Sequence, residues 1–239
     1  FLNAMGARIR GAGTDVIRVD GANRLRGVRH AIIPDRLEAA TIAMAVGAAG
    51  GEVTLTNVMP EHLRSPLMKL MEAGVHIGVN DSSLTVRHEG RLQAVDVETA
   101  VYPGFPTDLQ QPFVAMLSIA DGTSLVRETV FDGRFRYVDE LCRLGADIKV
   151  ERDTAIIRGV DRLTGAPVEI TDLRAGAALM IAGLVAESET ELSQVEILDR
   201  GYERLDEKLR SLGAEVVRLD DDGSDMPDFA DLGKANVAL

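Results

Sequence analysis

The chain has 239 residues, enough for one or two domains with a substantial hydrophobic core. Its formal net charge of −12 repels phosphate backbones and anionic membrane surfaces, and its 4% aromatic content leaves few rings on which nucleic-acid bases could stack. We therefore expect neither a nucleic-acid nor a membrane partner, and an anionic ligand would need a local arginine cluster.

The single cysteine, Cys142, excludes a disulfide within the chain and argues against a thiolate zinc site. No apolar run approaches the roughly 20 residues of a membrane span, and no signal segment opens the sequence. These features favour a cytoplasmic protein. The sequence opens in mid-pattern at Phe1, so we expect it to belong to a larger architecture.

Residues 1–27 resemble the tail of a repeat that recurs later in the chain. The segment "LNAMGARI" around Gly6 returns as "LMEAGVHI", "LCRLGADI" and "LRSLGAEV". The four central glycines are spaced 68, 71 and 68 residues apart, at Gly6, Gly74, Gly145 and Gly213. Each of the last three glycines is predicted to stop a helix.

Three similar units follow the opening tail, at about residues 28–96, 97–165 and 166–218. Each has an aspartate in front of an apolar run, which predicts a helix with that aspartate as its N-cap: Asp35, Asp108 and Asp172. Asp35 with Glu38, and Asp108 with Gln111, also have the spacing of a capping box.

After its first helix, each unit continues with a turn, a short strand, a second helix and a hairpin such as "DIKVERDTAIIRGV". The third unit has one hairpin arm, "AEVVRLDDD", which runs into an acidic tail at 219–239, so its sheet is one strand short. Three such units should bury their helices together inside a ring of sheets. The sequence thus predicts an α/β fold with its helices inside.

Six motifs resemble the enolpyruvyl transferases, over about residues 1–218: "GTDVIRVDG", "IPDRLEA", "YPGFPTDLQ", "ETVFDGRF", "TDLRAGAAL" and "DRGYERLDEKLRSLGA". The resemblance implies two similar domains, each an inside-out α/β barrel of three βαβαββ-type repeats, with substrates between them. This chain would then hold the second domain, 28–218, preceded by the tail of a missing first domain.

The resemblance also implies a reaction. "PGFPTDLQ" and "DRGYER" together favour the branch that moves the enolpyruvyl group of phosphoenolpyruvate to the 3'-hydroxyl of UDP-N-acetylglucosamine, releasing phosphate, as the first committed step of peptidoglycan synthesis. It requires no cofactor and no metal, and half of such an enzyme should be inactive alone. Two alternatives stay open: the shikimate-pathway branch of the family, and a detached, non-catalytic binding module.

Asp108 matches the family acid that contacts the sugar hydroxyl and is the candidate base. Its position before an apolar run equally predicts a helix N-cap, as for its repeat counterparts Asp35 and Asp172, whose expected role is capping. The two roles conflict, because a carboxylate that accepts helix amides has a lowered pKa and is a weaker base. We expect Asp108 to fill both.

By the same resemblance, Arg200 matches an arginine that holds phosphoenolpyruvate, while Arg134 and Arg174 match site arginines near the cleft. The alternative reading is an exposed helix-start arginine for Arg200, and surface salt-bridge partners for Arg134 and Arg174. Val130 matches a position that contacts the sugar nucleotide, and otherwise reads as a strand valine.

Cys142 stands between Leu141 and Leu144 on a predicted helix. We therefore expect it to pack or flank that helix, because the reactive cysteine of the family belongs to the first domain. The four histidines show no metal-ligand spacing, and we expect them to be structural or surface residues.

Overall fold

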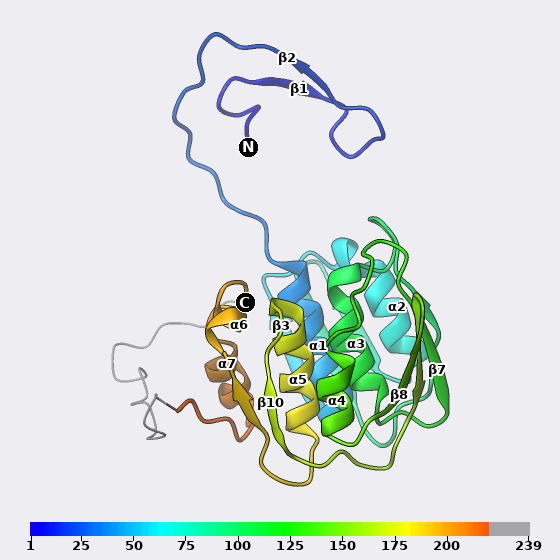
Figure 1. Cartoon of the computed structure of the whole chain (residues 1–239). Helices are drawn as coiled ribbons and strands as arrows, with labels where there is room; N and C mark the ends of the chain where they lie inside the picture. Colours follow the sequence, from blue (N-terminus) through cyan, green and yellow to red (C-terminus); the bar gives the residue numbers. More distant parts are fainter. Residues whose placement is uncertain (220–239) are drawn as a thin grey trace. The chain divides into compact units, whose positions relative to one another are not determined.

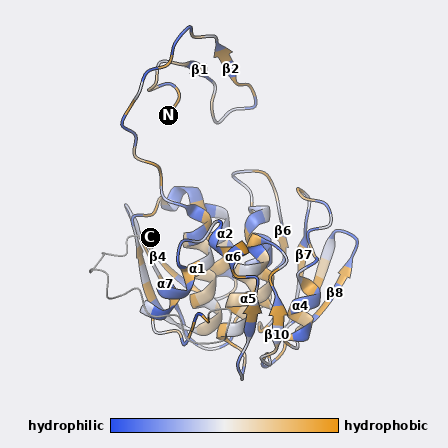
Figure 2. Cartoon of the chain, turned by 60° about the vertical axis from the view of Figure 1, so that its left-hand side comes forward, coloured by the Kyte–Doolittle hydropathy of each residue, from blue (hydrophilic) through white to orange (hydrophobic). Residues whose placement is uncertain are grey.

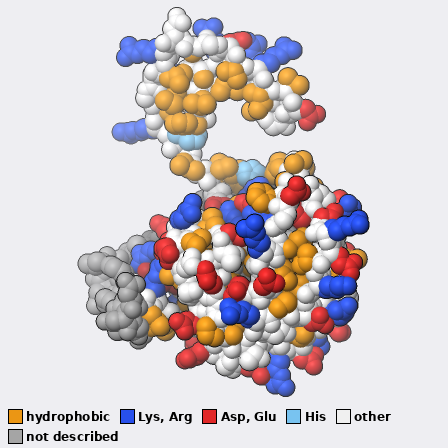
Figure 3. Space-filling model, viewed as in Figure 1, with side chains coloured by type: hydrophobic (Ala, Val, Ile, Leu, Met, Phe, Trp, Pro, Cys, Tyr) orange, Lys and Arg blue, Asp and Glu red, His pale blue; other side chains and the backbone are white. Residues whose placement is uncertain are grey.

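The computed structural model describes residues 1–219 and divides the chain into two compact units, Phe1–Ile33 and a larger one that begins at Pro34. The first unit holds an antiparallel pair of strands, β1 (Arg8–Arg10) and β2 (Arg18–Asp20). Apolar side chains gather on this unit (Figure 3), and Val16, Ile17 and Val19 are each at least 60% exposed.

The first repeat of the larger unit forms a three-stranded antiparallel sheet of order β3-β5-β4. Its elements are α1 (Arg36–Ala49), β3 (Gly51–Thr56), the 3₁₀ helix η1 (Pro60–Leu63), α2 (Arg64–Glu72), β4 (His76–Asn80) and β5 (Ser83–His88). The helix, strand, helix and hairpin appear in the predicted order.

The second repeat is the most complete, with a four-stranded sheet of order β6-β7-β9-β8 in which β6 and β7 are parallel. Its elements are β6 (Val97–Glu98), the 3₁₀ helix η2 (Thr107–Leu109), α3 (Gln110–Leu117), β7 (Thr123–Arg127), α4 (Val138–Arg143), β8 (Asp147–Glu151) and β9 (Thr154–Arg158). Strand β7 ends earlier than the sequence indicated, so residues 128–131 form a turn at its end.

The third repeat has a parallel strand pair and three helices. Its elements are β10 (Pro167–Glu169), α5 (Leu173–Leu184), β11 (Glu191–Ser193), α6 (Glu196–Asp199) and α7 (Leu205–Ser211). Residues 214–218, predicted as a hairpin arm, form no strand. Nothing in the described part of the chain pairs with them as a second arm, and most of the predicted acidic tail, 220–239, lies outside the described residues.

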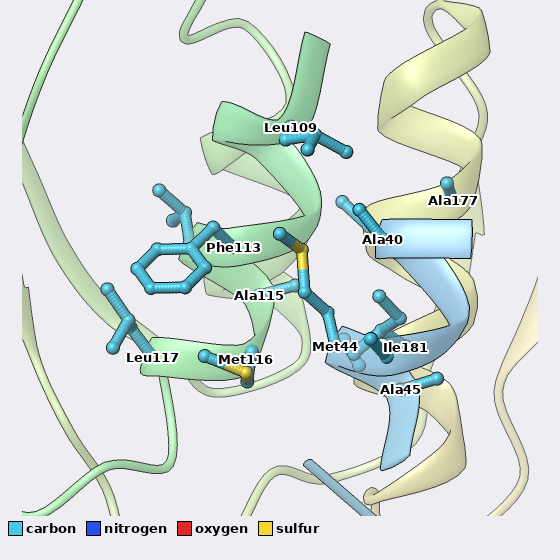
Figure 4. Packing of buried hydrophobic residues seen from close by; sticks show 14 of the residues in the cluster. Ala40, Met44, Ala45, Leu109, Phe113, Ala115, Met116, Leu117, Ala177 and Ile181 are labelled. Carbon is cyan, nitrogen blue, oxygen red and sulfur yellow. The ribbon is translucent and has the colours of Figure 1, made fainter. Parts of the chain in front are cut away.

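Helices α1, α3 and α5 lie side by side at the centre, with the sheets around them (Figure 1). Residue numbers rise in the same direction along all three helices, so the helices are parallel (Figure 4). They are apolar on nearly every side: all eight residues of α3 are buried, as expected for helices without a solvent face. Hydrophilic residues instead dominate the outer helix α7 (Figure 2).

The three repeat glycines end their helices as predicted. Gly74, Gly145 and Gly213 have φ values of 95°, 88° and 100°, a conformation that favours glycine. The next amide in each case donates back across the last turn, as from Val75 to the carbonyl of Leu70 at 3.0 Å. This shared ending is direct structural evidence of the repeat.

Candidate functional site

The starts of the central helices α3 and α5 meet at one end of the helix layer. Gln111 of α3 donates a hydrogen bond to the carboxylate of Asp172, which caps α5, at 3.3 Å. Asp172 in turn accepts the first amides of α5, and Asp35 accepts the amide of Leu37 at 2.7 Å in α1. Asp35 and Asp172 are therefore N-caps, as predicted from their sequence positions.

Asp108 does not cap a helix, contrary to the prediction from the repeat. It lies inside η2, whose N-cap is Pro106 without a side-chain hydrogen bond. Its Oδ1 accepts a hydrogen bond from Arg134 Nη2 at 2.7 Å, and its Oδ2 accepts one from Arg174 Nη2 at 3.0 Å. The 3₁₀ turn places the aspartate within reach of two guanidinium groups, and both carboxylate oxygens bind to them.

The predicted capping boxes do not close either. Gln111 reaches Asp172 of the neighbouring helix, and Glu38 forms an ion pair with Lys208. In both cases the side chain three residues after the aspartate bonds to a residue that belongs to, or caps, another helix. Spacing along the chain could not reveal these tertiary partners.

Two arginines lower the pKa of the Asp108 carboxyl. Burial raises the pKa of its carboxyl, but the hydrogen bond from Arg134 and the charges of Arg174 and Arg134 outweigh burial and hold the pKa below its usual value. The sequence predicted a lowered pKa caused by helix amides, and the structure replaces that cause with two guanidinium groups. Asp108 is ionised at neutral pH and ready to accept hydrogen bonds.

Arg134 and Arg174 are mostly buried, with side chains 14% and 12% exposed, so they are not surface salt-bridge partners. Arg134 stacks over the ring of Phe131 at 5.1 Å. Arg174 stacks over the ring of Tyr202 at 5.3 Å, and its Nη1 is buried without a hydrogen-bond partner in the described part of the chain. Both guanidinium groups are held in fixed positions beside a half-buried carboxylate.

Glu128 belongs to the same network and was not identified from the sequence. Its side chain is buried, and Oε2 accepts the hydroxyl of Thr107 at 2.7 Å while Oε1 accepts the hydroxyl of Thr99 at 2.7 Å. Thr107 in turn accepts a hydrogen bond from Arg134 Nη1 at 2.8 Å. The available sequence signal was a carboxylate directly after strand β7. The alternation of apolar and polar residues along the predicted strand made Glu128 look like an ordinary strand residue.

The other two predicted site residues, Val130 and Arg200, make no direct hydrogen bond to Asp108. Val130 is 44% exposed, and its amide donates to Glu128 Oε1 at 2.8 Å. Arg200 is exposed at the end of α6, and within residues 1–219 its side chain makes no hydrogen bond or ion pair. The structure thus joins Asp108, Arg134 and Arg174 and leaves Arg200 available to solvent.

Cys142 is exposed on α4 and donates only a weak hydrogen bond to the carbonyl of Ile148, at 3.8 Å, so it flanks the helix as expected. Between residues 1 and 219, no three His, Cys, Asp or Glu side chains are grouped as metal ligands. In the same range, no helix is long and apolar enough to cross a membrane.

The family model described as EPSP synthase (3-phosphoshikimate 1-carboxyvinyltransferase) matches residues 1–209 of this chain. The chain belongs to the EPSP synthase family. Its predicted resemblance to enolpyruvyl transferases is confirmed, and with it the α/β class of the fold.

Among curated relatives in this family, the UDP-N-acetylglucosamine 1-carboxyvinyltransferase 2 of Symbiobacterium thermophilum is 56% identical over 219 residues, which is 92% of this chain and 52% of the relative. The UDP-N-acetylglucosamine 1-carboxyvinyltransferase of Clostridium botulinum is 54% identical, with the same coverage of 92% and 52%. The chain therefore spans about half the length of the curated relatives it matches.

Two solved structures have a similar fold. The enolpyruvyl transferase NikO from Streptomyces tendae has a TM-score of 0.78 and 28% identity, over 90% of this chain and 52% of that one. EPSP synthase from Acinetobacter baumannii has a TM-score of 0.59 at 20% identity, over 77% of this chain and 44% of that one. The second likeness shows the shared fold alone.

Proposed function

We propose that this chain forms part of a UDP-N-acetylglucosamine 1-carboxyvinyltransferase. In that reaction the enolpyruvyl group of phosphoenolpyruvate moves to the 3'-hydroxyl of UDP-N-acetylglucosamine, and phosphate leaves. The observation that carries the proposal is an ionised Asp108 held between two buried arginines at the start of α3. The choice of the sugar nucleotide over shikimate 3-phosphate is supported by identities of 54–56% to enzymes with the sugar-nucleotide name.

The end of the helix layer that holds Asp108 is suited to bind anions. The N-terminal ends of parallel helices carry partial positive charge, which favours phosphate and carboxylate groups. Arg134, Arg174 and Arg200 would add guanidinium forks that match both groups. This local positive charge offsets the net charge of −12 that would otherwise repel phosphoenolpyruvate.

We assign Asp108 to the sugar hydroxyl, either as its base or as the group that orients it. With its pKa lowered by Arg134 and Arg174, the carboxylate is a weak base in the free protein. A substrate phosphate or carboxylate would compete for the same guanidinium groups and loosen their hold on Asp108. Its pKa would then rise, and exclusion of water would raise it further.

The remaining substrate contacts follow the same assignment. Arg200 would hold phosphoenolpyruvate, because its guanidinium is exposed and makes no ion pair within the described residues. Val130, with 44% of its surface exposed, would contact the sugar nucleotide. The reaction proceeds by acid–base and electrostatic catalysis, which uses no cofactor or metal.

We further propose that about residues 28–218 form an inside-out α/β barrel of three repeats, and that β1 and β2 end a repeat of a partner domain. The exposed apolar residues Val16, Ile17 and Val19 support this arrangement, because such a face is normally covered. The chain alone would be inactive, and the complete enzyme cytoplasmic.

Binding to the 239-residue chain tests the proposed site. In titrations followed by ¹H–¹⁵N NMR, phosphoenolpyruvate should shift the side-chain signals of Arg134, Arg174 and Arg200, and UDP-N-acetylglucosamine should shift the amide of Val130. Shikimate 3-phosphate at equal concentration should leave Val130 unchanged. Shifts of Val130 with shikimate 3-phosphate alone would favour the other branch of the family.

A further inference from the structure

The residue after strand β7 differs from its counterparts in the other two repeats. Asn57 follows β3 and Gln194 follows β11, and both have exposed side chains and positive φ values, 55° and 60°. Glu128 follows β7, has no positive φ, and is only 6% exposed. A buried carboxylate thus occurs at this position only in the repeat that carries Asp108.

The carboxylate of Glu128 accepts four hydrogen bonds. Oε1 accepts the hydroxyl of Thr99 at 2.7 Å and the amides of Val130 and Phe131 at 2.8 and 3.0 Å. Oε2 accepts the hydroxyl of Thr107 at 2.7 Å. Three donors share Oε1 and one, Thr107, bonds to Oε2. Because Glu128 is also only 6% exposed, its carboxylate is engaged within the fold and is not open to a substrate.

The direction of these bonds matters for the site. Thr107 has one hydroxyl proton and gives it to Glu128, so the lone pairs of its oxygen face Arg134. Arg134 can therefore place Nη1 on Thr107 and Nη2 on Asp108, at 2.8 and 2.7 Å. A guanidinium held at two nitrogens cannot turn away from the carboxylate without losing both bonds.

We propose that Glu128 is a positioning residue, which fixes the guanidinium of Arg134 against Asp108 through the hydroxyl of Thr107. The same carboxylate holds the turn at Val130 and Phe131, and Phe131 supplies the ring under Arg134. Glu128 therefore ties the segment before α3 to the turn after β7. The importance of Glu128 for catalysis rests on the proposed function. The hydrogen bonds that link Glu128, through Thr107 and Arg134, to Asp108 do not depend on that proposal.

A purely structural role is the alternative, in which Glu128 only closes the turn after β7. Substitutions at Thr107 distinguish the two roles, because Thr107 lies outside that turn and is not needed to close it. Thr107→Val removes the hydroxyl and keeps the shape of the side chain, whereas Thr107→Ser keeps the hydroxyl. In Glu128→Gln the amide oxygen must face Thr99 and the two backbone amides, so its NH₂ group faces Thr107 and cannot accept the hydroxyl proton.

The test is the pKa of the Asp108 carboxyl in the 239-residue chain, measured by ¹³C NMR titration, with amide spectra as the check of folding. Thr107→Val should raise this pKa toward the usual value of aspartate, because Arg134 loses its second anchor. Thr107→Ser should leave it at the wild-type value. An unchanged pKa in folded Thr107→Val would overturn the proposal.

Glu128→Gln also removes a negative charge, which by itself lowers the pKa of Asp108. We therefore compare the effect of Glu128→Gln in the wild-type and Thr107→Val backgrounds, since the charge effect is common to both. If Glu128→Gln raises the pKa of Asp108 more, or lowers it less, in the wild-type background than in the Thr107→Val background, the result supports transmission through Thr107. Equal changes in this pKa in the two backgrounds contradict it. If Glu128→Gln does not fold, the Thr107 pair alone decides. No readout uses turnover, so the proposed function can fail independently.

Discussion

Replacing Asp108 by asparagine should destabilise the fold, because its carboxylate is the shared partner of two mostly buried arginines. A hydrogen bond to a charged group contributes about 1.5–3 kcal/mol when shielded, and screening reduces this here because the Asp108 side chain is 35% exposed. We take about 1 kcal/mol for each bond, plus the cost of leaving two cations without their counter-charge. Asp108→Asn should then lower the free energy of unfolding by about 2–3 kcal/mol.

The chain contains its own matched control at the equivalent position of the first repeat. Asp35 accepts only a helix amide, that of Leu37, and asparagine caps helices about as well as aspartate. Asp35→Asn should therefore change the free energy of unfolding by no more than about 0.5 kcal/mol. The difference between the two variants isolates the arginine clamp from helix capping.

The loss of stability in Asp108→Asn should also depend on pH, and the direction of this dependence follows from the lowered pKa of Asp108. A depressed folded-state pKa means that the carboxylate stabilises the fold above its unfolded pKa of about 3.9 and loses this contribution as the pH falls through the folded value. Urea unfolding followed by circular dichroism measures the free energy of unfolding of the Asp108→Asn and Asp35→Asn variants at pH 7 and below pH 4. An Asp108→Asn variant as stable as Asp35→Asn at pH 7, or a gap that does not narrow in acid, would refute the reasoning.

Three further predictions concern other parts of the chain. Gly159→Ala should cost about 2–4 kcal/mol in urea unfolding, because a Cβ there would lie 1.7 Å from the carbonyl oxygen of Ala120; an alanine variant of wild-type stability would contradict this backbone contact. His88 is 3% exposed and neither ring nitrogen has a partner within residues 1–219, so His88→Leu should keep or raise the melting temperature, and a clear drop would reveal a missed polar contact. Arg200→Ala should leave urea unfolding unchanged to within about 0.5 kcal/mol while weakening phosphoenolpyruvate binding in calorimetry at least about tenfold, whereas unchanged affinity would remove Arg200 from the site.

The repeat made much of the fold predictable from the sequence. Helix-ending glycines and N-cap aspartates depend on local backbone chemistry, and Gly145 and Asp172 took the expected roles. The buried character of α1, α3 and α5 followed from apolar runs without a polar face. The hairpin of β8 and β9 followed from alternation around a polar turn.

The site was less predictable, because its bonds join residues that are distant in sequence. Asp108 looks like Asp35 and Asp172 in the repeat, but Arg134 and Arg174 lie 26 and 66 residues away and take its carboxylate. Glu128 followed an ordinary strand pattern, and only its burial and four bonds set it apart. Local patterns identified the candidate residues and could not show which of them meet.

Turnover in a complete enzyme tests the central claim most directly. The matching segment of the Symbiobacterium thermophilum relative, 219 aligned residues, can be replaced by that of this chain, and phosphate release from phosphoenolpyruvate measured. We predict release with UDP-N-acetylglucosamine, no release with shikimate 3-phosphate, and loss of activity on Asp108→Asn. A folded chimera that releases phosphate with shikimate 3-phosphate, or with neither acceptor, or that keeps near-normal turnover after Asp108→Asn, would contradict the account.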